Sequence, residues 1–137
     1  MNEYSLRYSE ARPDFYIPRP NEWRKQASKN VQASDGYFES NAGDYFEGRT
    51  STICNLAYEA YQEMINHGVA REQARIVLPL NLYTTMTVCW DLKNLIHFIA
   101  LRDGAHAQLE IQVYGKAMKS LISQVVPWVV ELYEEKI

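Results

Sequence analysis

The sequence predicts a single α+β domain over residues 1–137, and three observations support that prediction. The chain is 47% hydrophobic and 23% charged, as is usual for one soluble globular domain with its own core. In the second half, apolar residues recur every three or four positions, which indicates helices. The stretch from Leu80 to Trp90 is instead rich in β-branched and aromatic residues in rough alternation, so we expect a strand there. The sheet is expected to include the opening residues as well.

The residues over about 19–50 are polar and rich in turn-forming types. Proline stands at positions 18 and 20, and Asp35-Gly36 favours a turn. We expect a long polar surface loop here, with one helical turn near Asn21 to Gln26. Loops of this length often carry function or move.

A helix is predicted to run from Ser51 or Thr52 to about His67. Either hydroxyl can cap its start, and Gly68 supplies a stop signal. Five apolar residues at helical spacing are expected to face the core: Ile53, Leu56, Ala57, Ala60 and Met64.

Shorter helices are predicted further along the chain. One covers Val69 to Val77 and ends near Pro79, and another covers Leu92 to Leu101. The apolar stripe of the second consists of Leu92, Leu95, Ile96 and Ile99. Lys93 and His97 lie on another side of it, which leaves them free to bind a ligand.

The next predicted helix starts at Ala105 and is apolar on two sides. Only a narrow strip around Gln108, Gln112 and Lys119 is polar, so we expect this helix to be central or at a subunit interface. Pro127 then opens a last short helix.

Charge and cysteine content limit the possible partners and compartments. A net charge of −3 disfavours binding of nucleic acid polymers, so a nucleotide would need a few well-placed cations. Cys54 and Cys89 are far apart, and the first residues do not resemble a signal peptide. No segment approaches the roughly 20 apolar residues that cross a bilayer. We therefore expect a cytoplasmic protein without a membrane partner.

Polar side chains cluster at the start of the chain. If this segment is extended, Glu3, Ser5 and Arg7 project to one side and offer an acceptor, a hydroxyl and a cationic fork. That set suits a phosphorylated, hydroxylated small molecule, and the alternative is a solvated edge strand with a surface ion pair. A nucleophilic role for Ser5 is disfavoured because no histidine or G-x-S-x-G motif lies near it in sequence.

Two later arginines and a set of possible metal ligands are open to more than one interpretation. Arg75 stands among apolar residues, so burial would require an anionic partner, either a structural carboxylate or a ligand phosphate. Arg102 closes a helix, where it could stabilise the helix dipole or lie against the edge of a base. Zinc binding by Cys89, His97 and His106 is disfavoured because their spacing matches no known ligand pattern, and no metal is expected.

The order of these motifs resembles the C-terminal part of the flavin-dependent thymidylate synthases, the ThyX family. Asn2 to Tyr8 matches the second half of the family signature R-H-R-x-x-S-x-N-E-x-S-x-R-Y. Further matching segments are Asp14 to Pro18, Ala74 to Thr84, Leu95 to Phe98, Leu101-Arg102 and His106 to Ile111. The resemblance extends over essentially the whole chain.

This resemblance implies a fold, an assembly and a reaction. The fold is α+β, with helices packed on a small, mainly antiparallel sheet, and the assembly is a homotetramer whose active sites lie where subunits meet. The reaction converts dUMP to dTMP. Methylenetetrahydrofolate supplies the carbon unit, NADPH supplies the reducing equivalents through bound FAD, and no protein nucleophile takes part.

The resemblance also implies roles for individual residues. The positions that would bind dUMP are Glu3, Tyr4, Ser5, Leu6, Arg7, Arg75 and Arg102. The positions that would bind FAD are Glu3, Asp91, Leu92, Lys93 and His97. Arg102 is the implied catalytic residue, because a fixed cation beside the uracil favours ionisation at N3 and makes the ring a better carbon nucleophile. Asp91 and Lys93 stand where the family commonly has Asn and Arg.

The Arg-His-Arg half of the signature is absent from these residues, together with everything the family places before it. We therefore expect a complete site to need a second chain that supplies the N-terminal half. The alternative is a nonenzymatic nucleotide-binding or oligomerisation module derived from the same fold. A third interpretation is an unrelated α+β domain whose cations are all structural.

Overall fold

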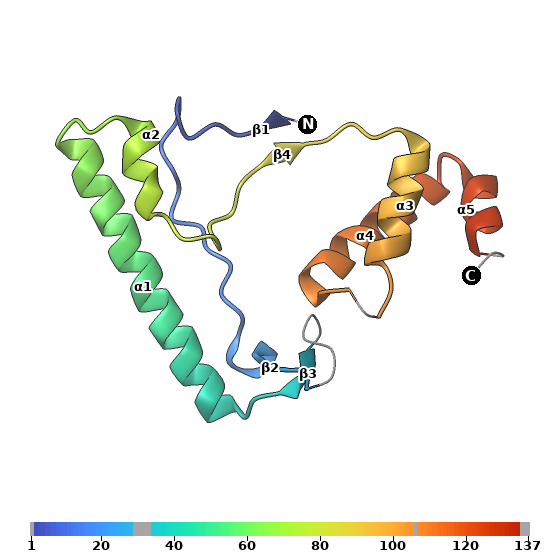
Figure 1. Ribbon diagram of the computed structural model, residues 1–137, viewed down its shortest axis with the longest axis horizontal. Helices are drawn as coiled ribbons and strands as arrows, with labels where there is room; N and C mark the ends of the chain where they lie inside the picture. Colours follow the sequence, from blue (N-terminus) through green and yellow to red (C-terminus); the bar gives the residue numbers. More distant parts are fainter. Residues whose placement is uncertain (1, 29–33, 106, 135–137) are drawn as a thin grey trace. The chain divides into compact units, whose positions relative to one another are not determined.

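The structure, a computed structural model, describes residues 2–28, 34–105 and 107–134 (Figure 1). In chain order its elements are β1 (Asn2–Glu3), η1 (Pro20–Glu22), β2 (Arg24–Gln26), β3 (Ser34–Tyr37), α1 (Ser40–Asn66), α2 (Arg71–Ala74), η2 (Arg75–Val77), β4 (Met86–Thr87), α3 (Leu92–Arg102), α4 (Leu109–Ser123) and α5 (Pro127–Glu134). Helices dominate and the strands are short, which confirms the predicted α+β class. His106, in the zinc set that the sequence disfavours, lies outside the described residues.

The chain divides into two compact units. Unit 1 comprises Met1–Lys25 and Gly36–Val88, and unit 2 comprises Gln26–Asp35 and Cys89–Ile137. Helices α1 and α2 belong to unit 1, whereas α3, α4 and α5 belong to unit 2.

Helix α1 is much longer than the sequence predicts. It begins at Ser40 and contains 27 residues, whereas the capping pattern places its start at Ser51 or Thr52. The hydroxyl of Thr52 instead donates to the carbonyl of Gly48 at 2.8 Å, a bond made inside a helix that has already begun. The predicted loop over 19–50 is therefore wrong from Ser40 onward, although the predicted stop at Gly68 is confirmed by its φ of +80°.

Tertiary packing explains the early start of α1. The ring of Phe46 packs against Trp23 and Phe38, with centroids 5.5 and 5.2 Å apart. Gly43 allows the helix to touch Pro20, since a Cβ at position 43 would lie 1.8 Å from the Pro20 carbonyl oxygen. These contacts override the low helix propensity of glycine, and they cannot be seen in a local sequence pattern.

The core of unit 1 lies where α1 meets the amino-terminal segment. Tyr61 and Ala74 are fully buried, and Ala11 is 4% exposed. The partly buried side chains around them are Leu6, Tyr58, Met64, Ile65, Val77, Leu78 and Leu82. Of the predicted apolar stripe of α1, Ile53 and Leu56 are more than half exposed, so the stripe is wrong at its start.

The stretch from Leu80 to Trp90 is not a continuous strand, since residues 80–81 form a turn and strand β4 covers only Met86–Thr87. Strand β4 pairs with β1 in an antiparallel ladder that places Asn2 opposite Thr87. An isolated antiparallel bridge joins Phe15 to Leu82. The opening residues therefore do join a small antiparallel sheet, but the predicted strand is shorter than expected. Strands β2 and β3 form a second two-stranded sheet.

Helices make up most of the described part of unit 2. Helix α3 covers the predicted segment and buries Ile99, which is 1% exposed. Helix α5 begins at Pro127 as predicted, whereas α4 begins at Leu109 rather than at Ala105. None of the helices in residues 2–28, 34–105 and 107–134 combines the length and apolar character that a membrane span requires.

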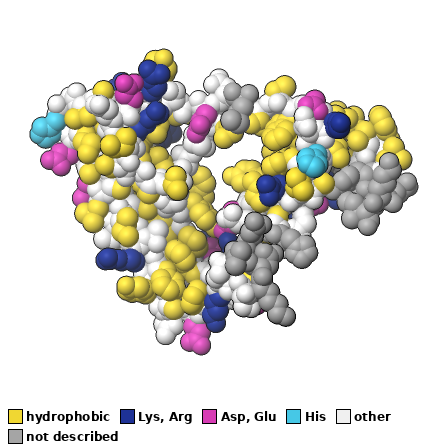
Figure 2. Space-filling model, viewed as in Figure 1, with side chains coloured by type: hydrophobic (Ala, Val, Ile, Leu, Met, Phe, Trp, Pro, Cys, Tyr) yellow, Lys and Arg dark blue, Asp and Glu magenta, His cyan; other side chains and the backbone are white. Residues whose placement is uncertain are grey.

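The polar strip of α4 turns out to face inward in part. Gln112 is buried, and its side-chain amide donates to the Ala107 carbonyl at 2.6 Å. Some apolar side chains of α4 are exposed instead, among them Val113 and Leu121, which are 67% and 64% exposed. Apolar side chains are spread over the face of the molecule seen in Figure 2.

Candidate functional site

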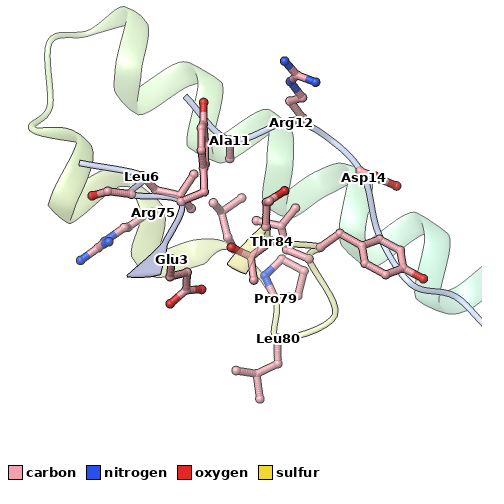
Figure 3. Close-up of a pocket in the computed structure, with 15 residues that line it drawn as sticks. Glu3, Leu6, Ala11, Arg12, Asp14, Arg75, Pro79, Leu80 and Thr84 are labelled. Carbon is pink, nitrogen blue, oxygen red and sulfur yellow. The ribbon is translucent and has the colours of Figure 1, made fainter. Parts of the chain in front are cut away.

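A cavity of about 720 Å³ opens in unit 1 (Figure 3). One wall comes from the amino-terminal segment through Glu3, Tyr4, Ser5, Leu6, Ala11, Arg12 and Asp14. The other comes from residues 75–85 through Arg75, Leu78, Pro79, Leu80, Leu82, Tyr83, Thr84 and Thr85. This volume lies within the range of small-molecule sites.

The amino-terminal segment pairs with the other wall at two points and leaves it in between. At one end, the Tyr4 amide donates to the Thr85 carbonyl at 2.8 Å, next to the β1–β4 ladder. At the other end, the Tyr83 amide donates to the Asp14 carbonyl at 2.8 Å. Residues 5–13 lie between the paired ends and take a separate course, where they are bound by α1 and α2.

The predicted alternation of Glu3, Ser5 and Arg7 along one strand is wrong. Strand β1 ends at Glu3, and a turn follows in which the Tyr8 amide donates to the Ser5 carbonyl at 3.2 Å. The Ser5 hydroxyl accepts from the Arg7 amide at 3.3 Å, a local bond that favours a turn over a strand. Glu3 and Ser5 line the cavity, whereas Arg7 pairs with Glu72 of α2 at 3.3 Å.

Arg75 lines the cavity from η2, but it is not buried as its apolar neighbours predict. The adjacent Ile76 is 77% exposed, so the apolar run around Arg75 does not define a core position. An exposed guanidinium does not require a structural carboxylate to offset desolvation. The arrangement therefore favours a cation that is available to a ligand in the cavity.

The sequence did not identify several other cavity residues, three of which are polar and add new chemistry. Arg12 adds a second cation, Asp14 adds a carboxylate and Thr84 adds a hydroxyl. Together with Arg75 and Ser5, they give a lining that suits a small ligand with both phosphate and hydroxyl groups. The available signal was positional: Arg12 and Asp14 precede the Phe15 bridge to Leu82, but that pairing is not visible in the sequence.

A smaller hollow of about 280 Å³ lies in unit 2. It is lined by Cys89, Trp90, Asp91, Asn94, His97, Phe98, Leu101 and Arg102. The hollow brings together three of the predicted residues, Asp91, His97 and Arg102, whereas Leu92 and Lys93 are exposed and do not line it. No cluster of three or more His, Cys, Asp or Glu side chains suited to a metal ion occurs within the described ranges.

Asp91 caps the first turn of α3. One carboxylate oxygen accepts from the Asn94 amide at 2.9 Å, and the other accepts from the Asn94 side chain. The backbone hydrogen bond and then the side-chain hydrogen bond lower the pKa of Asp91 below its ordinary value. An acid at this position also interacts favourably with the helix dipole, so Asp91 has a local structural role.

Helix α4 fixes the end of α3 that carries Arg102. A Cβ at Gly115 would lie 3.0 Å from the Arg102 carbonyl carbon, so the two helices touch here through backbone. Lys119 pairs with Asp103 at 3.4 Å, one residue beyond Arg102. The Arg102 residue itself is exposed, which leaves an available side chain on a well-anchored main chain.

Two solved structures of one nucleotide methylase resemble this chain closely. The UMP/dUMP methylase PolB from Streptomyces cacaoi with bound 5-Br dUMP gives a TM-score of 0.84 at 27% identity, covering 98% of this chain and 60% of that one. The same protein with 5-Br UMP gives 0.88 at 28% identity, covering 98% and 62%. The chain therefore has the α+β fold of a nucleotide methylase.

The sequence matches the family described as thymidylate synthase complementing protein, Thy1, over residues 1–128. The chain belongs to this family, which confirms the resemblance found in its motifs. It is 41% identical to flavin-dependent thymidylate synthases of Wolbachia pipientis and Thermus thermophilus, covering 93% and 98% of this chain but 45% and 48% of those proteins. The Thermosipho africanus protein of the same name is 38% identical, with coverages of 97% and 58%. The chain thus spans about half the length of the curated relatives it matches.

Proposed function

We propose that this chain carries the dUMP-binding part of a flavin-dependent thymidylate synthase. The assembled enzyme would methylate dUMP to dTMP, with methylenetetrahydrofolate as carbon donor and NADPH as reductant. The observation that carries the proposal is the unit 1 cavity. It collects Glu3, Tyr4, Ser5, Leu6 and Arg75, five of the seven residues implied to bind dUMP, in a chain of the thymidylate synthase family.

In this proposal the cavity holds the nucleotide through its charges and hydroxyls. Arg75 is the phosphate-binding cation, because guanidinium groups form strong, directional hydrogen bonds with phosphate. Ser5 contributes its hydroxyl as a hydrogen-bonding group, not as a nucleophile. Arg7 joins the site by exchanging Glu72 for the ligand, since their exposed ion pair is worth at most about 1 kcal/mol.

Arg102 would act on the uracil ring. A guanidinium beside N3 stabilises the anion that forms when N3 loses its proton, and the ionised ring is the better carbon nucleophile. The close contact of Gly115 with the Arg102 backbone supports this role, because electrostatic stabilisation requires a fixed position. In this proposal α4 holds the Arg102 main chain in place.

The residues implied to bind FAD fit an anionic cofactor in part. Lys93 and His97 are exposed on α3 and offer a cation and a ring nitrogen, which suits the pyrophosphate of a dinucleotide. Leu92 would supply an apolar contact, and Asp91 and Glu3 would accept hydrogen bonds. When bound, FAD would supply the redox chemistry by carrying electrons from NADPH to the reaction.

Assembly is part of the same proposal. We expect a homotetramer, or a complex with a chain that supplies the N-terminal half, and a cytoplasmic location. The exposed apolar side chains of α4 and the residues just after it support an interface, since Val113, Leu121 and Val125 are 67%, 64% and 79% exposed.

The test compares this chain alone with the chain mixed with the N-terminal half of the Thermus thermophilus relative. Flavin absorbance, dUMP binding and dUMP-dependent NADPH oxidation are measured in both samples. We expect dUMP binding by the chain alone, with FAD binding and dTMP formation only after mixing. Binding of dUMP without turnover in any mixture would favour the nonenzymatic module, and absence of both would contradict the proposal. Full turnover by the chain alone would contradict the need for a second chain.

A further inference from the structure

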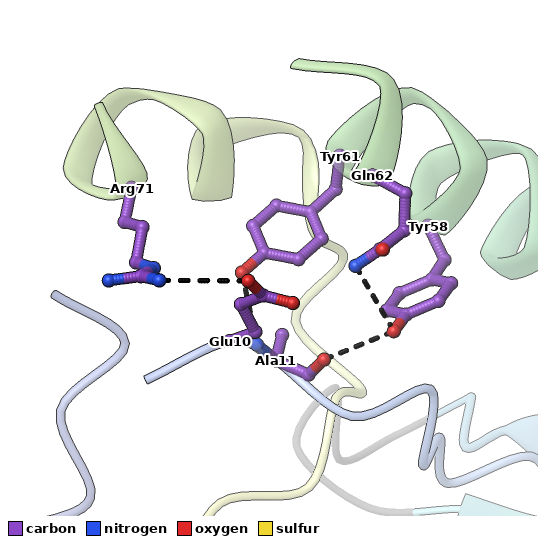
Figure 4. Close-up of polar contacts among 6 residues, drawn as sticks. All are labelled: Glu10, Ala11, Tyr58, Tyr61, Gln62 and Arg71. Atoms are coloured by element: carbon purple, nitrogen blue, oxygen red, sulfur yellow. Dashed lines mark hydrogen bonds and ion pairs between the residues drawn. The ribbon is translucent and has the colours of Figure 1, made fainter. Parts of the chain in front are cut away.

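Two tyrosines of α1 hold the main chain of one cavity residue, Ala11 (Figure 4). The Ala11 amide donates to the Tyr61 hydroxyl at 3.0 Å in a buried bond. The Tyr58 hydroxyl donates to the Ala11 carbonyl at 3.2 Å. Because the two tyrosines are three residues apart, they lie on the same face of the helix and reach both polar groups of one residue.

The direction of the second bond is set by a neighbour on the same helix. The Gln62 side-chain amide donates to the Tyr58 hydroxyl at 3.3 Å, so the hydroxyl proton is directed to the Ala11 carbonyl. Burial, and then the proximity of Tyr61 and Glu10, raises the pKa of Tyr58 and keeps this donor protonated.

Ion pairs from α2 flank these hydrogen bonds. Arg71 lies 3.6 Å from Glu10, and Arg7 lies 3.3 Å from Glu72. Both pairs are roughly half exposed, so they contribute little compared with the buried amide of Ala11. The polar contacts of the segment from Arg7 to Ala11 are therefore made with α1 and α2, while Leu78 and Leu82 pack against the core cluster that contains Ala11.

The position of Ala11 in the chain connects these hydrogen bonds to the cavity. Residues on both sides of it pair with the opposite wall, at Tyr4 with Thr85 and at Asp14 with Tyr83. On the opposite wall only Thr84 separates Tyr83 from Thr85, so residues 5–13 form an excursion whose backbone groups need other partners. The two tyrosine hydroxyls supply those partners for the amide and the carbonyl of Ala11.

We infer that Tyr58 and Tyr61 are positioning residues that hold Ala11 against α1 and so fix the part of the cavity wall that carries Leu6, Ala11 and Arg12. The inference rests on the proposed function for the identity of the ligand, dUMP. It assigns to α1, which contributes no residue to the cavity lining, control over the shape of the binding site.

The experiment uses the full chain with Tyr58→Phe and Tyr61→Phe, each of which removes one hydroxyl and keeps the ring. The matched control is Tyr45→Phe, because Tyr45 is on the same helix and is 66% exposed. Isothermal titration calorimetry gives the dissociation constant for dUMP. Amide hydrogen exchange over residues 6–13 reports the main chain directly, with the amides of Tyr4 and Tyr83 as internal references.

We expect faster exchange at residues 6–13 in both variants and wild-type rates at Tyr4 and Tyr83. The dUMP dissociation constant should rise on the order of tenfold, the change that the loss of one hydrogen bond produces, while Tyr45→Phe stays at the wild-type value. Unchanged affinity in both variants would overturn the inference, even with faster exchange, because the tyrosines would then serve folding alone. If Tyr61→Phe does not fold, Tyr58→Phe decides.

Failure of the proposed function would look different. If the wild-type chain does not bind dUMP, the proposed ligand is wrong, and exchange then tests the narrower claim that the two tyrosines hold the main chain of Ala11. Acceleration confined to residues 6–13 would support it, and unchanged exchange would overturn it.

Discussion

Unit 1 and unit 2 build their candidate binding surfaces in different ways. The unit 1 cavity lies between the amino-terminal segment and residues 75–85, and its residue Ala11 bonds to Tyr61, 50 residues away. The unit 2 hollow lies along α3 and the residues before it, and its Asp91 cap bonds to Asn94, three residues away. The first surface depends on tertiary packing and the second on local helix geometry, so mutations should affect them separately.

The largest effect is expected in the core of unit 1. Tyr61→Ala removes a fully buried ring and should lower the free energy of unfolding by about 3–5 kcal/mol, as for other large aromatic truncations. Urea denaturation measures this loss. The matched control is Tyr114→Ala in α4, where the side chain is 56% exposed and the change should stay within about 0.5 kcal/mol. Similar losses at both positions would contradict the difference between the units.

A smaller effect is expected where α4 touches α3. Gly115→Val places a side chain against the Arg102 backbone and should cost about 1–3 kcal/mol through overpacking. Turnover by the assembled enzyme should fall as stability falls. The unit 1 cavity should keep its structure, so the Tyr4 and Tyr83 amides should exchange hydrogen at wild-type rates. Ala117→Val, on an exposed position of the same helix, is the control. A strong change in the exchange of Tyr4 and Tyr83 would show that the two surfaces are not independent.

At alkaline pH the side chain whose titration lowers stability lies in unit 1. Because the pKa of Tyr58 is raised in the folded protein, its contribution to stability is complete below the ordinary value of 10.0 and is lost as pH rises through the raised value. Ultraviolet absorbance of the phenolate should show one late-titrating tyrosine that is absent in Tyr58→Phe. Loss in the variant of a tyrosine that titrates at the ordinary value, with the late-titrating one kept, would contradict the raised pKa of Tyr58.

At acid pH the side chain whose titration lowers stability lies in unit 2. We expect this loss of stability to be the smallest of the predicted effects. The lowered pKa of Asp91 means that its contribution is complete above the ordinary value of 3.8 and is lost as pH falls through the lowered value. Asp91→Asn should preserve the cap at neutral pH, since Asn caps helices as well as Asp does, and should remove this acid dependence. The prediction is checked by NMR, which follows the thermal unfolding of α3 from about pH 2 to about pH 7. This range brackets the titration of a carboxyl group. The prediction fails if the unfolding of α3 depends on pH in the same way in the variant and in the wild type.

The local features of the fold could be predicted from the sequence. Gly68 marks the end of α1, Pro127 the start of α5, and the apolar stripe of α3 identifies Ile99 as a buried residue. These predictions succeed because each depends on neighbours within one or two helical turns.

The features that failed depend on distant partners. The start of α1 at Ser40 depends on Trp23 and Phe38, and the turn at Ser5 replaced the strand that alternation predicts. The family signature did identify the residues of the cavity wall, such as Glu3 and Ser5, but not the way in which Ala11 is held. A bond between residues 50 positions apart leaves no periodic pattern in the sequence.

The most direct test of the central claim is a titration of the isotope-labelled chain with dUMP, followed by amide chemical shifts. We predict saturable shifts in the two walls of the unit 1 cavity, over residues 3–6 and 75–85, and their loss in Arg75→Ala. The matched control is Arg49→Ala, a cation of α1 that is not among the residues that line the cavity. Shifts confined to other parts of the chain, or shifts that persist unchanged in Arg75→Ala, would contradict the assignment of this cavity to dUMP.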